Sequence, residues 1–130
     1  MAIQVSSGIC AESKAPRSTT PGAAACDNRA QDEGRPYSLC LAELQFRASE
    51  TEMNRHWIVA LAQERAVKGP GAARRLRTEQ RAWRDVRNAE CARVAQAGRA
   101  TYFAINELGC LTSWTTRRAD FLQALAISKR

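Results

Sequence analysis

Proline and glycine divide this chain into long stretches that hold few of the residues typical of β-strands. The breaks lie at residues 34–36, 69–71 and 98. The stretches between them are rich in alanine, leucine, glutamate, glutamine and arginine, which favour helix. The sequence predicts a short N-terminal segment at 26–33 and main helices near 38–67, 72–97 and 101–127. Short connections make neighbouring helices antiparallel, so we predict an all-α, up-and-down bundle of three main helices.

Two of the predicted helices carry apolar stripes at helical spacing. In the helix at 38–67 the stripe consists of Leu39, Ala42, Phe46, Met53, Trp57, Ala60 and Leu61. In the helix at 101–127 it consists of Tyr102, Ile105, Leu108, Leu111, Thr115, Leu122 and Leu125. Such stripes are typical of helix faces that pack into a core, so we expect these side chains to point inward.

The first 25 residues differ in composition from the rest of the chain. They contain no aromatic residue and are rich in serine, threonine, proline, glycine and alanine. We therefore predict a disordered leader over 1–25 and one helical domain over 26–130, since 130 residues suffice for a single modest core. No apolar run approaches the roughly 20 residues that cross a bilayer, and residues 1–25 lack the apolar segment of a signal peptide.

Five cysteines are a large number for a chain of this length. Their spacings contain no C-x-x-C pair and the chain has one histidine, so zinc ligation and thioredoxin-type chemistry are poorly supported. Disulfides formed in an oxidising compartment are the better interpretation, which predicts a periplasmic or secreted protein. Cys10 lies in the predicted leader and is the odd thiol, which would allow a disulfide-linked dimer.

The geometry of antiparallel helices restricts how the other four cysteines pair. Residues at equal height in a helical hairpin have position numbers with a constant sum. A turn near 99 or 100 places Cys91 beside Cys110, and a turn near 34 places Cys26 near Cys40, within the roughly 7 Å that a disulfide allows. Pairing of Cys40 with Cys91 is rejected, because it leaves an axial offset of roughly 12 Å. The set Cys26 with Cys91 and Cys40 with Cys110 stays open as an alternative.

The predicted central helix carries polar residues on the face that should be buried. Leu76, Gln80, Trp83, Arg87 and Cys91 recur at spacings of four, three, four and four, so they share one face. A buried arginine is tolerated only when it is paired and hydrogen-bonded. The bundle must therefore supply partners from the neighbouring helices.

Hairpin geometry indicates which residues these partners are. Arg87 falls within one turn of Glu50 and Asn54 on the first helix and close to Thr115 on the third. Trp83 falls level with Arg118, whose guanidinium can lie on the indole ring. We predict a polar network inside the bundle, formed by Glu50, Asn54, Gln80, Trp83, Arg87, Thr115 and Arg118. The alternative, left open, is that the same residues open into a groove that binds a ligand.

The order of these motifs resembles a known family. The run Leu76, Gln80, Trp83, Arg87 and Cys91 is similar to the signature of the lysozyme inhibitor LprI-like domain, a bacterial envelope family first catalogued as a domain of unknown function. Further matches from Cys26 to about Leu125 are Cys26, Cys40, Glu50, Met53, Asn54, Trp57, Cys110, Thr115, Arg118 and Leu122. The resemblance implies a small, helical, disulfide-bonded, exported domain with no catalytic residues. Because one named member is associated with lysozyme inhibition, it also implies a protein partner, host lysozyme or another protein.

Several positions depart from the family pattern. The family usually has leucine before the asparagine of the first helix, and an aspartate and a tyrosine nearby, where this chain has Met53, Glu50 and Trp57. These are mostly changes within one residue type. At Asn88, however, the family usually has aspartate, so any role of that carboxylate is lost here.

The charge of the chain points to a second class of partner. The formal net charge is +7, and residues 65–99 hold ten basic and three acidic side chains, a net +7. Arg74, Arg77, Arg81 and Arg84 form a stripe about 100° around the helix from the motif face, so we expect them to face solvent. The alternative function is binding of anionic polymers: envelope polysaccharide, lipid head groups or, less favoured without a base-reading motif, nucleic acid.

No motif for catalysis, a metal or a cofactor is present in the sequence. His56 is the only histidine, and no phosphate loop, nucleophile elbow or metal-ligand cluster occurs. We therefore expect a protein that is not an enzyme and carries no cofactor.

Overall fold

The computed structural model describes residues 22–27, 36–98 and 102–128. The part of the predicted leader up to residue 21 lies outside the described residues, as do Cys10 and residues 28–33 of the predicted N-terminal segment. Residues 23–27 are helical. Helical structure therefore begins before Cys26, where we placed the boundary of the domain.

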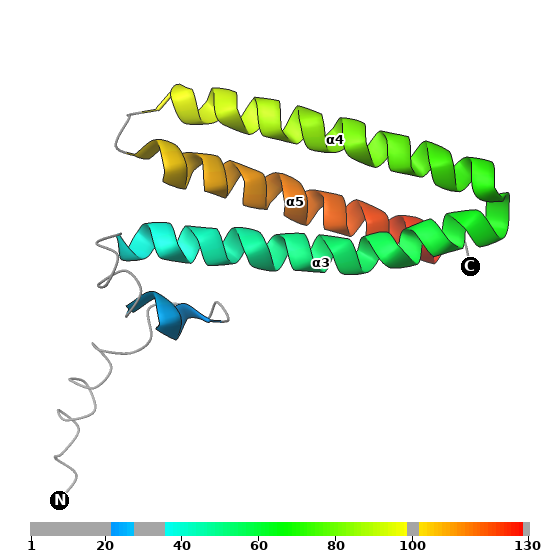
Figure 1. The fold of residues 1–130 in the computed structure, drawn as a ribbon, viewed down its shortest axis with the longest axis horizontal. Helices are drawn as coiled ribbons and strands as arrows, with labels where there is room; N and C mark the ends of the chain where they lie inside the picture. The colour runs from blue at the N-terminus through cyan, green and yellow to red at the C-terminus, as the bar shows by residue number, and fades with distance from the viewer. Residues whose placement is uncertain (1–21, 28–35, 99–101, 129–130) are drawn as a thin grey trace, which may run out of the picture.

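Three long helices form the body of the protein. They are α3 (Tyr37–Lys68), α4 (Pro70–Gln96) and α5 (Phe103–Ser128). Figure 1 shows α4 running back against the direction of α3, and α5 returning parallel to α3. The prediction of an all-α, up-and-down bundle of three main helices is confirmed. Within the described residues, no helix is both long enough and apolar enough to span a membrane.

A single residue connects α3 to α4. Gly69 has a φ of 94° and a ψ of 175°, which residues with a side chain rarely adopt. Its N–H donates to the carbonyl of Arg65 over 2.9 Å, closing the last turn of α3. Pro70 follows at the start of α4, where its missing N–H costs nothing because the first helical N–H groups have no partner within the helix. The Gly-Pro pair therefore reverses the chain without a longer loop.

The apolar core is built largely from small side chains. Its buried members are Met53, Ala60, Leu76, Ala119, Leu122 and Ala126, and the half-buried Trp57, Leu61, Trp83 and Leu125 pack against them. Alanines on α5 let this helix approach α3 closely, and α3 packs more extensively on α5 than on α4. A core with so few large apolar side chains leaves much of the stability to other interactions.

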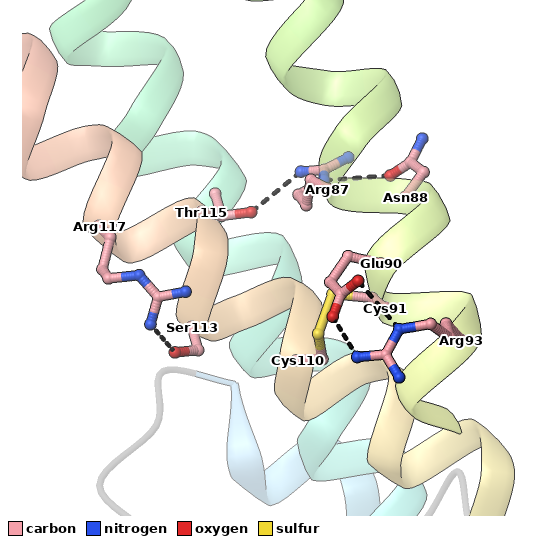
Figure 2. Close-up of a disulfide and its surroundings, with 9 residues drawn as sticks. All are labelled: Arg87, Asn88, Glu90, Cys91, Arg93, Cys110, Ser113, Thr115 and Arg117. Carbon is pink, nitrogen blue, oxygen red and sulfur yellow. Dashed lines mark hydrogen bonds and ion pairs between the residues drawn. A yellow bond between two sulfur atoms is a disulfide. The ribbon is translucent and has the colours of Figure 1, made fainter. Parts of the chain in front are cut away.

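Two disulfides supply part of that stability. Cys26 is bonded to Cys40 with a Cα–Cα distance of 5.6 Å, and Cys91 to Cys110 with a distance of 5.4 Å. The pairing predicted from hairpin geometry is confirmed, and the alternative set is excluded. One bridge joins the segment 23–27 to α3, and the other joins α4 to α5 near their connection (Figure 2).

One member of the predicted stripe on the third helix is placed differently. Tyr102 is exposed, although we expected it to point inward. The reason is that α5 begins at Phe103, so Tyr102 precedes the helix and does not share its inward face. Thr115 and Leu122, in the middle of the same stripe, are fully buried.

Candidate functional site

Arg87 lies at the centre of a polar layer that spans all three helices. Its side chain is 5% exposed, and its Nη1 donates to Glu50 Oε2 on α3 and to Thr115 Oγ1 on α5, each over 2.9 Å. Its Nε donates to Asn88 Oδ1 over 3.1 Å. Figure 2 shows Arg87 reaching from α4 toward Thr115, about one turn from the Cys91–Cys110 bridge. One guanidinium thus connects α3, α4 and α5 at a single height.

A second set of contacts lies further along the bundle. Gln80 is buried, and its Oε1 accepts from Arg118 Nε on α5 over 2.8 Å. The amide nitrogen of Gln80 lies 3.6 Å from the sulfur of Met53 on α3, a weak acceptor. Gln80 therefore contacts both α3 and α5, as Arg87 does about two helical turns further along α4.

Aromatic rings alternate with the two guanidiniums. The guanidinium carbon of Arg87 lies 5.4 Å from the Phe46 ring centre and 5.1 Å from that of Trp83. The guanidinium carbon of Arg118 lies 5.5 Å from the Trp83 ring centre and 4.7 Å from that of Phe121. Trp83 thus contacts both cations, at distances where the ring's negative face attracts them.

The layer contains more positive than negative charge. Arg87 pairs with Glu50, whereas no carboxylate within ion-pair distance of Arg118 is found among the described residues. Burial lowers the pKa of Arg118, and the charge of Glu79 opposes this shift. The Nη2 atom of Arg118 is buried without a hydrogen bond. The faces of Trp83 and Phe121 therefore supply the attraction that a counter-ion would otherwise provide.

The structure places two of the predicted residues differently from our expectation. Asn54 is exposed and is not among the described hydrogen-bond partners of Arg87, which are Glu50, Asn88 and Thr115. Asn54 follows Met53, which points into the core, and one residue rotates the side chain by about 100°. Trp83 is half-buried, although we expected it inside the bundle.

The arginine stripe divides between two parts of the surface. Arg74, Arg81 and Arg84 are exposed as expected, whereas Arg77 is half-buried. Arg77, Arg81 and Arg84 line a hollow of about 260 Å³ together with Trp57 and Gln80. Arg74 lines a different hollow with Arg75. We had assigned Trp57 to the core, which it contacts, and its place at the edge between α3 and α4 also exposes it to this hollow.

Neither the polar layer nor the rest of the described chain offers a metal centre. No group of three or more histidine, cysteine, aspartate or glutamate side chains in the described residues is arranged to hold an ion. His56 is half-buried and its Nε2 lies 3.6 Å from Glu52 on the same helix. The layer itself binds side chains to one another, so its geometry is that of a structural network.

Comparison with known proteins identifies the family. The family model described as "Lysozyme inhibitor LprI" matches residues 10–122, which is most of the chain. This chain belongs to the LprI lysozyme inhibitor family. The match begins at residue 10, before Cys26, where the motif resemblance began. No curated protein and no solved structure matches the chain.

Proposed function

We propose that this LprI-family chain is a non-catalytic, exported envelope protein that binds and inhibits lysozyme. The observation that carries the proposal is the family match over residues 10–122. Two disulfides support an oxidising location, the periplasm or the cell exterior. Inhibition by binding requires a stable surface and no reactive group, which suits a bundle whose polar layer is engaged internally.

Electrostatics restrict how such a complex would form. Animal lysozymes are generally basic, and this chain carries a net charge of +7. Like net charges slow association, because long-range repulsion opposes the encounter. Salt screens that repulsion over a Debye length of about 8 Å at physiological ionic strength. Inhibition of a basic lysozyme should therefore persist or strengthen as salt rises, until screening also weakens the local contacts.

A lysozyme activity assay tests the proposal. The oxidised protein is added to a basic animal lysozyme acting on a peptidoglycan suspension, and the rate of clearing is followed across a salt series in which lysozyme alone is the reference. We expect a dose-dependent loss of lysis that does not diminish between low and physiological salt. The reduced and alkylated protein is the matched control, because it has the same sequence and lacks both bridges. Full lysis at every salt concentration, with the oxidised protein folded, would overturn the proposal.

Binding of anionic polymers is the second candidate function. The observation that favours it is the set of exposed arginines on α4, Arg74, Arg81 and Arg84, which have no carboxylate partner among the described residues. Retention on immobilised heparin, eluted with salt, measures this activity independently of lysozyme. Elution well below physiological salt would contradict it.

A further inference from the structure

The hollow between α3 and α4 combines one aromatic side chain with several hydrogen-bond donors. Trp57 comes from α3, and Arg77, Gln80, Arg81 and Arg84 come from α4. We propose that this hollow binds an acidic sugar unit of an anionic glycan chain. The inference rests on the second candidate function, polymer binding, and is independent of lysozyme inhibition.

The chemistry of the lining matches an oxyanion. Each guanidinium presents five N–H donors and no acceptor, and an indole ring offers only a donor. The one strong acceptor in the lining, the side-chain oxygen of Gln80, already accepts from Arg118 over 2.8 Å. A carboxylate or sulfate group entering the hollow would therefore meet donors from several sides, and arginine can bind such groups through two parallel hydrogen bonds.

Within the described residues, no ion pair neutralises the three arginines of the hollow. Arg77 and Arg81 are four residues apart and Arg81 and Arg84 three, so the like charges are neighbours on one helix face and repel. By contrast, Glu52 pairs with Arg55 and Glu90 with Arg93 elsewhere on the surface. Asp85, four residues after Arg81, offsets part of this repulsion, and an anionic ligand in the hollow would supply further negative charge.

The surroundings of the hollow favour a glycan over a lipid surface. A membrane-binding helix face needs exposed apolar anchors beside its basic residues. The exposed large apolar residues of α4 are Val86 and Val94. Val86 lies about 200° around the helix from Arg84, and Val94 lies almost three turns beyond it along the axis. The basic face of α4 therefore lacks such anchors. On α3, Ile58 is exposed but lies about 100° around the helix from Trp57, whereas the ring of Trp57 lines the hollow and offers an apolar surface on which the C–H face of a sugar can pack.

Nucleic acid is the less favoured polyanion. Phosphates recur along a nucleic-acid strand and would engage basic residues on a continuous track. Here the nearest further arginines, Arg74 and Arg75, line a separate hollow. Disulfides are also rare in cytosolic and nuclear proteins, which are the proteins that meet most cellular nucleic acid.

A titration of the oxidised full chain with an oligogalacturonate tests the site. Binding is followed by the indole N–H signals in the NMR spectrum, with Trp57 assigned through the Trp57→Phe variant. We expect the Trp57 signal to move and the signal of Trp114, which does not line the hollow, to stay. A neutral dextran oligomer is the ligand control and should move neither signal.

Two matched double variants separate the hollow from bulk charge. Arg81→Glu with Arg84→Glu changes the hollow, and Arg74→Glu with Arg75→Glu changes neighbouring arginines outside it. All four side chains are exposed, so both variants should fold, which far-UV circular dichroism checks. Each pair lowers the net charge by four, from +7 to +3. The first pair should weaken oligogalacturonate binding at least roughly tenfold and the second at most roughly threefold.

Three results would overturn the proposal. If both double variants weakened oligogalacturonate binding equally, the overall charge of the protein would account for the binding. Polymer binding, the second candidate function, would then still hold, but the hollow would not be its site. If oligogalacturonate left the Trp57 signal unmoved while the protein was still retained on heparin, the hollow would likewise be excluded as the polymer-binding site. If the hollow pair instead abolished binding of an oligothymidylate or of phosphatidylglycerol vesicles while oligogalacturonate moved no signal, the ligand would be a phosphate and not an acidic sugar.

Discussion

Replacing Arg87 with methionine tests the buried polar layer directly. Methionine keeps much of the aliphatic packing but removes the guanidinium that joins Glu50 to Thr115. Removing one partner of a fully buried ion pair costs about 3 to 5 kcal/mol. The Glu50 side chain is 31% exposed, however, so water can partly replace its partner. We therefore assign only about 1 to 2 kcal/mol to the lost pair.

Two further losses add to that figure. Thr115 is fully buried, and losing its hydrogen bond to Arg87 costs about 1 kcal/mol. The cation–π contacts of Arg87 with Phe46 and Trp83 contribute about another 1 kcal/mol together. The expected destabilisation by Arg87→Met is about 3 to 4 kcal/mol, a large part of the roughly 5 to 15 kcal/mol typical of a domain.

Urea unfolding followed by far-UV circular dichroism, with both disulfides intact, measures this change. Arg84→Met is the matched control, because Arg84 lies three residues away on the same helix and is exposed. Its free energy of unfolding should stay within about 0.5 kcal/mol of the parent. An Arg87→Met protein less than about 1 kcal/mol below the parent would refute the network. If the Arg87→Met protein stayed that stable and also failed to bind a ligand that the parent binds, the groove hypothesis would replace the network hypothesis.

Three other perturbations test the remaining parts of the structure. Trp83→Ala should destabilise by about 3 kcal/mol in the same assay, the low end for a large aromatic residue because the ring is half-buried, and an unchanged midpoint would argue against its packing between two guanidiniums. Replacing both Cys91 and Cys110 with alanine should cost about 3 kcal/mol, since the bridge spans 19 residues, and a loss below about 1 kcal/mol would contradict this. The hydrogen bond from Arg93 lowers the pKa of Glu90 below its ordinary value of 4.5, so the pair stabilises above that pH and its contribution is lost as pH falls through the lowered pKa. Glu90→Gln should therefore slightly lower the melting temperature at neutral pH and not in strong acid, and an equal effect at both would argue against the pair.

Much of the fold could be predicted because its determinants are local. Glycine and proline mark the ends of the helices, and the observed bounds differ from the predicted ones by at most two residues. The fixed rise along a helix then sets which residues lie level across a hairpin. That arithmetic favoured the observed cysteine pairs over one alternative set, and it placed Arg87 within one turn of Glu50 and close to Thr115. The position of a residue along the bundle axis can therefore be predicted from the sequence.

Rotation about the helix axis was harder to predict. Asn54 has the right height for the polar layer and points to solvent, and Arg77 turns far enough toward α3 to be half-buried. Residue spacing within one helix does not determine the exposure of Asn54 or of Arg77, since both depend on how the neighbouring helix is rotated about its axis. The hollow beside Trp57 escaped sequence reasoning for the same reason. A large aromatic residue on an apolar stripe indicates core packing, and only the position of α4 shows that one side of the ring remains open.

The two faces of α4 determine how activity in this protein should be mapped by mutation. Gln80 and Arg87 of the family motif contact both neighbouring helices, so we expect changes there to destabilise the chain and to lower any activity indirectly. Such variants report on a binding surface only where the protein stays folded. The exposed arginines contribute little to stability, commonly below about 1 kcal/mol each. A binding surface is therefore best sought with charge-matched changes such as those at Arg81 and Arg84, where a lost activity in a folded protein can be assigned to contact with the partner.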